Sequence, residues 1–274
     1  VLKHPNPAQA MGDFFQALYH YRLISGNAFI QATGPKNSPP TELYLLRPDR
    51  VAVIAGKGIF PSGYRYTVGE HSTDFPVDRI TGRSRILHVK TFHPLNDWYG
   101  LSPVEAAAYS IDQHNQSGAW NQALLQNGAR PSGALVVRMD AAGGGTLSEH
   151  PYTGVKLQIA EQFTGSANAG RPLLLEGGLD WKEMSLTPKD MDFVETKNSS
   201  ARDIALAFGV PPQLLGIPGD NRYSNLQEAR LAFWEQTVVP LVTCTVDTLN
   251  GWLLPQFDNN LELVADTDSI SALA

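Results

Sequence analysis

A long apolar stripe runs through the last third of the chain. Its side chains recur every three or four residues, and the polar Thr245 falls on the same face. The stripe consists of Leu231, Trp234, Val238, Leu241, Val242, Val246, Leu249, Trp252 and Leu253. This spacing is that of one wide face of a helix, predicted over 225–253. Pro240 lies inside the stripe and offers no N–H to the carbonyl of Gln236, so we expect a bend near 236–240. A break is the alternative, but the stripe keeps its phase across the proline, which favours a bend.

The first third of the chain has a different pattern. Apolar residues at helical spacing predict one amphipathic helix over 9–24. Short segments rich in Val, Ile, Tyr and Thr follow, separated by Gly, Pro and Asp, and they are interpreted as antiparallel strands: 26–34, 41–56, 62–69 and 83–92. Residues 1–95 are therefore predicted to form an α+β unit.

Capping signals predict the starts of three later helices. Ser102, Thr187 and Ser224 each place a hydroxyl where it can accept a hydrogen bond from a free backbone N–H, and proline follows the first two. Glycines, among them Gly209, mark the helix ends. The predicted ranges are 103–127, 188–208 and 225–253, and the segment between the first two reads as a smaller module with strands at GALVVRMD and RPLLLEGGLDWKEMSL.

The helix predicted at 103–127 is polar but almost uncharged. It has two acids in its N-terminal half, no Lys or Arg, and many alanine, serine, asparagine and glutamine residues. A helix of this kind has no broad apolar face for a single core, so we expect it to pack against neighbours on several sides. A partly exposed bundle helix is the alternative.

Charge and cysteine content restrict the possible functions. The chain has 274 residues, 18% of them charged, and a net charge of -6. A protein that holds nucleic acid tightly needs clustered Lys and Arg, so the charge argues against that function and leaves transient or sliding contact as the alternative. A single cysteine, Cys244, permits no internal disulfide, which favours a cytoplasmic origin.

We find no apolar run near the roughly 20 residues that cross a membrane, and no initiating Met, as expected for part of a longer polypeptide.

Catalytic and metal-binding patterns are weak. His88 and His93 flank a strand end without metal-ligand spacing, so a structural role is favoured. Asp97 has Asn96 beside it rather than a second acid, and Cys244 lies in mid-helix, where a buried inert thiol is expected. Gly56-Lys57-Gly58 lacks the strand-loop-helix context of a nucleotide phosphate cradle. We therefore expect no catalytic residue, no metal and no cofactor. A hydrolase that uses Asp97 or Glu176 is the competing hypothesis.

Several strings, in this order, resemble one protein family. They are SGNAFI at 25–30, LRPDRV at 46–51, ILHVKTFHPLNDWYGLSPVEAA at 86–107, NGARPSGAL at 127–135, GRPLLLEGGLDWKEMSLTPKD at 170–190, and IALAFGVPPQLLG at 204–216 followed by YSNLQEA. The chain resembles the portal protein of tailed bacteriophages of the siphovirus type, which also occurs in prophages and gene transfer agents.

The resemblance implies an α+β portal fold with six parts along the chain. They are an α/β wing at 1–95, a first stem helix at 96–130, a small α/β clip at 131–186, a second stem helix at 187–215, a tunnel loop at 216–225, and a kinked helix with the wing/crown connection at 226–274. Family members also carry residues before the wing and a C-terminal crown, which are not recognised in this sequence.

The resemblance also implies a function. Portal proteins form a ring of twelve subunits at one capsid vertex of the virion, through which double-stranded DNA enters and leaves, and they are assembled in the host cytoplasm. The expected partners are further copies of the chain, the large terminase subunit, a head-completion (adaptor) protein and the major capsid protein. Portal proteins have no catalytic activity of their own. A different structural protein of a virion neck or capsid is the other alternative.

Site residues follow from this mapping. Asn221, Arg222, Tyr223 and Ser224 are predicted to face the tunnel, with Ser224 also capping the next helix. In the clip-like strand, Lys182 and Glu183 are predicted to lie near the terminase or adaptor surface, and Pro240 marks the kink.

Overall fold

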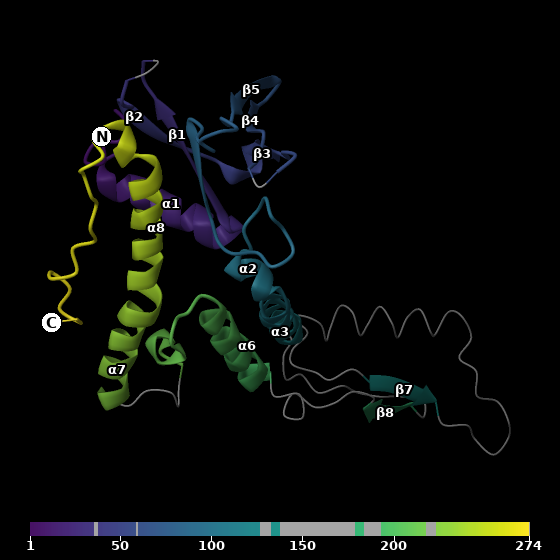
Figure 1. The fold of residues 1–274 in the computed structure, drawn as a ribbon. Coiled ribbons are helices and arrows are strands. Elements are labelled where there is room, and N and C mark those ends of the chain that lie inside the picture. Colours follow the sequence, from purple (N-terminus) through teal and green to yellow (C-terminus); the bar gives the residue numbers. More distant parts are fainter. Residues whose placement is uncertain are drawn as a thin grey trace. The chain divides into compact units, whose positions relative to one another are not determined.

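The computed structural model describes residues 1–35, 38–58, 60–126, 133–137, 179–183, 193–217 and 223–273. They divide into two compact units: Val1–Ala108 with Arg202–Ala274, and Tyr109–Ala201. Both ends of the chain thus belong to one unit, in which the helices α1 and α8 are joined by side chains 223 residues apart (Figure 1). The parts predicted as wing and kinked helix are therefore a single packed body.

The first unit is built on an antiparallel sheet with the strand order β2-β1-β6. Helix α1 (Met11–Ser25) leads into β1 (Asn27–Thr33), which pairs on one side with β2 (Glu42–Leu46) and on the other with β6 (Ile86–Lys90). Gly26 makes the turn between helix and strand with φ 73°, and a Cβ there would lie 2.4 Å from the carbonyl oxygen of Gly100. Only glycine fits this close approach.

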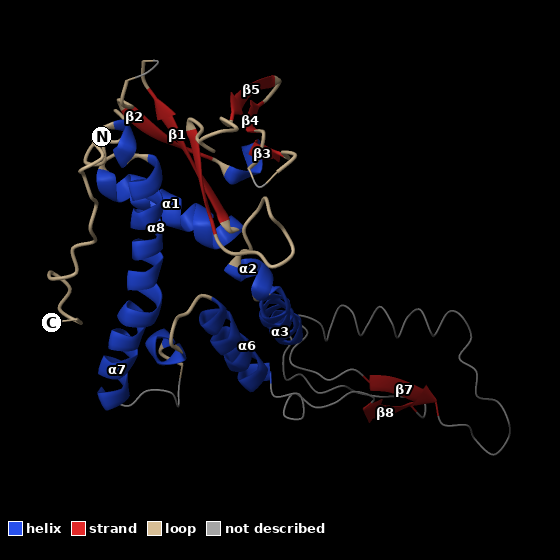
Figure 2. Ribbon diagram, viewed as in Figure 1, coloured by secondary structure: helices blue, strands red, loops and turns tan. Residues whose placement is uncertain are grey.

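The main core lies between this sheet, α1 and α8 (Val239–Trp252), as Figure 2 shows. Its members include Phe14 and Leu18 from α1, Ile30 and Leu43 from the sheet, and Leu249 from α8, all of them with no or almost no exposed surface. Each such side chain contributes about 1.5–3 kcal/mol by leaving water. The N-terminal and C-terminal parts of the sequence therefore fold as one.

A second antiparallel sheet, of order β3-β4-β5, shares a smaller core with the first sheet, in which Val51 and Tyr64 pack with Phe29 and Ile86. Its strands are β3 (Val51–Ile54), β4 (Gly63–Val68) and β5 (His71–Pro76). The 3-10 turn Pro48–Arg50 divides the segment 41–56 into β2 and β3, at the Pro-Asp pair that separates strands in the sequence. The sequence reading missed β5, whose residues are mostly polar and exposed.

The first predicted stem helix is interrupted. A short α2 (Pro103–Ala106) ends at Ala107, whose φ of -91° and ψ of 4° leave the helical region, and α3 (Ala108–Gln126) follows. The single helix over 103–127 is therefore wrong in its continuity. The predicted cap is confirmed, since the Ser102 hydroxyl accepts a hydrogen bond from the N–H of Val104 at 3.0 Å.

The described part of the second unit also contains a two-stranded ladder and most of a helix. Strand β7 (Gly133–Val137) pairs antiparallel with β8 (Leu179–Glu183). Helix α6 (Phe193–Ala207) begins in this unit and ends in the first one. The remainder of the predicted clip at 131–186, and the predicted helix start at Thr187, lie outside the described residues.

A continuous helical run closes the fold. It consists of α7 (Tyr223–Phe233), a π-helical turn (Trp234–Val238) and α8, with the 3-10 turn Leu254–Gln256 after it. By length and composition Asn225–Gln256 is apolar enough to cross a membrane, a test that a core helix also passes. The apolar stripe divides in two: Leu249, Trp252 and Leu253 are buried in the core, whereas Leu231, before the proline, is 38% exposed.

Candidate channel loop and its frame

The predicted tunnel loop lies between a 3-10 turn (Pro212–Leu215) and α7. Asn221 and Arg222 are outside the described residues. Tyr223 and Ser224 belong to the first turn of α7, so the predicted helix start at 225 is two residues late. A capping residue has extended backbone and stands before the first turn, and Ser224 is inside that turn. Its side chain lies outside what the structure describes, so the predicted capping role stays a prediction.

The segment that enters the loop is fixed by the end of α6. Gly209 has φ 69°, its N–H donates to the carbonyl of Leu206 at 2.9 Å, and the N–H of Val210 donates to Ala205 at 2.8 Å. These two bonds form a Schellman motif, which needs a left-handed residue and so favours glycine. The predicted helix end at Gly209 is confirmed.

A side-chain hydrogen bond joins the two flanks of the loop. The Thr237 hydroxyl, on the π-helical turn, donates to the carbonyl of Gly209 at 2.6 Å. A Cβ on Gly209 would lie only 2.7 Å from that hydroxyl oxygen, so the absence of a side chain allows the approach. This contact closes the base of a segment that runs from the end of α6, through the loop, to α7.

The π-helical turn lies where the bend was predicted. The N–H of Val239 donates to the carbonyl of Trp234, five residues back, and Pro240 follows in the first turn of α8. Proline has no N–H, and an inserted residue in the helix relieves the clash that its ring would cause in the turn before it. The helical run is continuous across Pro240, so the alternative of a break is wrong.

Beyond the π turn, a buried arginine joins α8 to α1. Arg22 is 6% exposed; its Nη1 donates to the Thr245 hydroxyl at 3.0 Å and its Nη2 to the Cys244 sulfur at 3.4 Å. Hydrogen bonds from a charged donor contribute about 1.5–3 kcal/mol. The expected buried thiol is wrong: Cys244 is exposed, since it lies one position before the buried Thr245 and faces another side of α8.

His88 holds the passage between β6 and α2. Its ring stacks on Phe29 at 4.2 Å, and its Nε2 lies 2.9 Å from Oδ1 of Asn27, which also accepts from the N–H of Gly100 at 2.7 Å. Burial, with a smaller effect of Lys90, lowers the pKa of His88 to about 3, so the ring is neutral and donates from Nε2. This is a structural role, as predicted. His93, in contrast, is half-buried and accepts from the N–H of Leu95.

The remaining candidate residues lie in separate segments of the chain. The Asp97 backbone carbonyl accepts from the ammonium of Lys90, and Glu176 lies outside the described residues. Lys182 pairs with Ala134 and Glu183 with Gly133 in the β7-β8 ladder, which places both on an ordered strand. Within the described ranges, no group of three His, Cys, Asp or Glu residues is arranged to hold a metal ion.

Comparisons with known proteins agree on one family. A family model described as phage portal protein matches residues 1–273. An uncharacterized protein of Rickettsia bellii is 50% identical over all of this chain and 69% of its own length, and the portal protein of Enterobacteria phage HK97 is 24% identical over 98% and 62%. Among solved structures, the neck of a native gene transfer agent particle, computed with C12 symmetry, contains a chain 45% identical to this one, with a TM-score of 0.69 over 99% of this chain and 75% of that chain.

The α+β fold, together with these matches, is that of a portal-type protein, and a chain similar to this one is part of the neck of a gene transfer agent particle. The chain belongs to the phage portal protein family. Portal function and location in a virion are thereby supported for it. The sequence resemblance to this family is confirmed.

Proposed function

We propose that twelve copies of the chain form a ring at one capsid vertex and that double-stranded DNA is packaged and ejected through its centre. The observation that carries this proposal is 45% identity, across nearly the whole chain, to a protein of a particle neck computed with C12 symmetry. A net charge of -6 suits a channel, because every phosphate bound by a cation adds affinity that translocation must break again.

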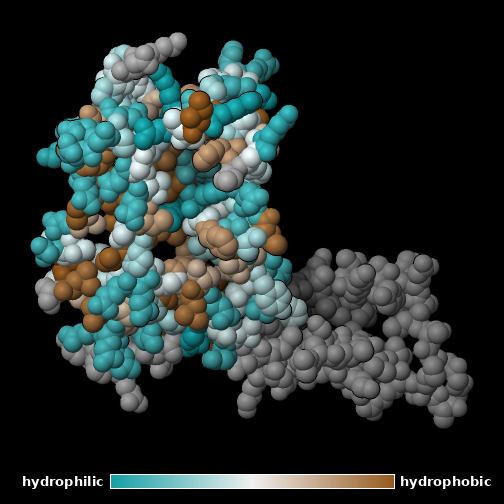
Figure 3. Space-filling view, in the orientation of Figure 1, coloured by the Kyte–Doolittle hydropathy of each residue, from teal (hydrophilic) through white to brown (hydrophobic). Residues whose placement is uncertain are grey.

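The surface of the isolated chain suits a ring. Among the described side chains of α3 only Ser117 is buried, whereas Tyr109 is 75% and Trp120 45% exposed. A hollow of about 460 Å³ on this unit is lined by α3 residues and Thr196 of α6. Hydrophobic patches interrupt the largely hydrophilic face in Figure 3. A closing ring must cover two different faces of each subunit, and we infer that the neighbouring copy covers α3.

In this proposal the loop around Asn221, Arg222, Tyr223 and Ser224 faces the channel. The Gly209–Thr237 contact closes the base of the loop, so its tip can touch passing DNA while its ends stay fixed. Replacing Asn221 and Arg222 by glycine and serine should leave ring formation unchanged and should alter the length or the retention of packaged DNA. Unchanged DNA content and retention would refute the channel assignment. Replacing the exposed Asn259 and Asn260 by glycine and serine controls for the change of side chain and backbone freedom in an exposed segment, and Arg222→Lys, which keeps the charge, controls for the loss of the cation.

The β7-β8 ladder is proposed to lie on the side where the large terminase subunit docks and the adaptor protein later replaces it. Reversing the charges of Lys182 and Glu183 should weaken both interactions, since charged groups at an interface set partner choice and encounter rate. Intact binding of both partners in a pull-down would refute this part. The chain contributes no catalytic group in this proposal, contacts the major capsid protein at its vertex, and is assembled in the host cytoplasm.

Electron microscopy of the purified protein tests the whole proposal. A twelve-fold ring with a central hole is expected, and a thirteen-fold ring would keep the channel while correcting the subunit number. Monodisperse monomers under all conditions would contradict the proposal. They would favour the enzyme alternative or a different structural protein of the neck.

A further inference from the structure

Basic residues are concentrated in one part of this acidic chain. Residues 47–85, which form the second sheet and its loops, carry seven Lys or Arg and four Asp or Glu, a net charge of +3. Since the total is -6, the rest of the chain carries -9. A local excess of this kind is the usual signature of a surface that meets a polyanion.

Most acids in this region are already engaged. Asp49 pairs with Arg47, and Asp74 with Arg65, each at 2.7 Å. Asp78 accepts two backbone N–H groups of its own loop, at 2.8 Å each, and these bonds lower its pKa. Lys57 and Arg79 make no ion pair and no side-chain hydrogen bond with any of the described residues. These two cations are therefore available to a ligand.

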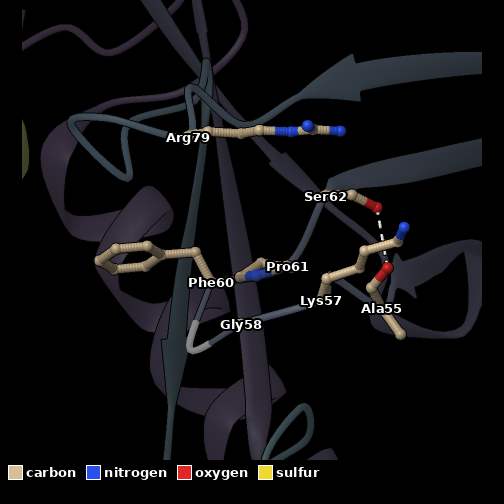
Figure 4. A pocket seen from close by; sticks show the side chains of 8 residues that line it. Ala55, Lys57, Gly58, Phe60, Pro61, Ser62 and Arg79 are labelled. Carbon is tan, nitrogen blue, oxygen red and sulfur yellow. Dashed lines mark hydrogen bonds between the residues drawn. The ribbon is translucent and has the colours of Figure 1, made fainter.

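Lys57 and Arg79 line the same hollow, of about 380 Å³, together with Gly58, Phe60 and Ser62. Figure 4 shows the ammonium and the guanidinium on the same side of the hollow as the Ser62 hydroxyl, while the Phe60 ring points the other way. That hydroxyl donates to the carbonyl of Ala55 at 2.9 Å, so it holds the loop closed. Two cations from different loops thus converge on one concave surface.

The first loop is closed tightly on itself, and the second packs against the Phe60 ring of the first. A Cβ on Gly56 would lie 2.0 Å from the carbonyl oxygen of Phe60, and one on Gly82 would lie 2.9 Å from the Phe60 ring. The second loop is further closed by the bond from the N–H of Gly82 to the carbonyl of Asp78 at 2.8 Å. Both cations therefore project from backbones that are held in place, which lowers the entropy that a ligand must remove on binding.

We propose that Lys57 and Arg79 bind backbone phosphates of double-stranded DNA. Arginine offers a planar fork of donors to phosphate oxygens and lysine a point charge, and neither side chain recognises a base when it contacts phosphate. The binding is sequence-independent and weak in a single chain, because only two phosphates are neutralised. The choice of DNA as the polyanion rests on the proposed portal function, and a ring of twelve sites would multiply the affinity. The site belongs to the second sheet and not to the proposed channel loop, so in this proposal it does not hold the DNA that moves through the channel.

A duplex-binding measurement tests the site directly. Anisotropy of a fluorescent 30-base-pair duplex is recorded against the whole chain at 25–200 mM salt, for the wild type and for Lys57→Ala/Arg79→Ala. We expect the double variant to bind about tenfold more weakly at the lowest salt, and the slope of log K against log salt to fall by about 2, or about 0.9 for each phosphate. An unchanged Kd and slope would overturn the proposal.

The control is Arg47→Ala/Arg65→Ala, which changes the net charge by the same amount in the same sheet but removes cations that are already paired. Its change in net charge alone will weaken binding somewhat. Beyond that weakening, the control variant should lose less than about twofold in affinity. Equal losses in both double variants would overturn the proposal, since they would show a general charge effect.

Ile80, 94% exposed beside Arg79, would suit an acidic protein segment instead. If Lys57→Ala/Arg79→Ala loses polyglutamate binding but keeps duplex binding, the phosphate assignment is wrong.

Electron microscopy of the same samples separates this inference from the proposed function. Rings are expected for wild type and for both double variants, because none of the four side chains belongs to α3 or to the Gly209–Thr237 contact. If rings form and Lys57→Ala/Arg79→Ala leaves duplex binding unchanged, only the phosphate site fails. If no rings form but duplex binding still depends on Lys57 and Arg79, the site stands and the portal proposal fails.

Discussion

The α1–α8 core and the helix α3 use their large side chains in opposite ways. In the core, Phe14 and Leu249 from the two ends of the chain are at most 1% exposed. In α3, only Ser117 is buried among the described side chains, and Tyr109 and Trp120 face outward. The difference indicates that the first region is packed within one chain, whereas the second leaves large side chains exposed, as the proposed ring requires of a surface that a neighbouring copy covers.

The largest expected effect comes from comparing two replacements of an aromatic side chain by alanine, one in each region. Phe14→Ala should lower the free energy of unfolding by about 3–5 kcal/mol, because it leaves a cavity in a fully packed core. Tyr109→Ala, in contrast, should change it by less than about 0.5 kcal/mol, as is usual for exposed positions. Urea denaturation of the isolated chain measures both. Similar losses in the two variants would remove the distinction between the regions.

A smaller effect tests whether the packed region extends to the Gly209–Thr237 contact, which closes the base of the loop. Gly209→Ala forces a left-handed alanine, which costs about 1–2 kcal/mol, and pushes its Cβ against Thr237. Gly216→Ala has a similar φ of 72° but open space around the new Cβ, so it should cost only the backbone part. The difference between the two, by urea denaturation, measures the Gly209–Thr237 contact. Equal costs would show that this contact does not hold the loop.

The loss of stability at low pH tests the packing around His88. Its pKa in the folded chain, about 3, is below the ordinary value of about 6.5, so the unfolded chain takes up the proton first. Stability is then full above pH 6.5 and is lost as the pH falls towards 3; between pH 6.5 and 5 the loss is about 1.5 kcal/mol. His88→Gln can still donate to Asn27 and should remove this part of the loss. The exposed His71→Gln should keep it, and identical pH profiles for both variants would contradict the assignment.

Local signals predicted the parts of this fold that depend on neighbouring residues. The Ser102 cap, the helix end at Gly209 and the uninterrupted helix across Pro240 are each decided within a few residues by capping, backbone freedom and apolar phase. The strand β5 was missed because its polar side chains carry no period-2 apolar pattern. It is held by pairing with β4, which includes the Arg65–Asp74 bridge.

The contacts that frame the candidate site could not be predicted locally. Arg22 and Thr245 are 223 positions apart, and nothing in either sequence neighbourhood points to the other. The same holds for Gly209 and Thr237, and for Lys57 and Arg79, which only the packing of two loops brings to one hollow. A lone arginine in the apolar face of the first helix was the available signal for the first of these pairs.

The smallest expected effect compares one glycine from each region. Gly118 in α3 and Gly251 in α8 both have open space where a Cβ would be, so alanine at either position should stabilise the isolated chain by about 0.5–1 kcal/mol through helix propensity. The two should differ once rings form. If a neighbouring copy packs closely on α3, Gly118→Ala lowers the fraction of rings counted by electron microscopy, while Gly251→Ala does not. Equal ring fractions for both variants would show that α3 is not closely covered at this position.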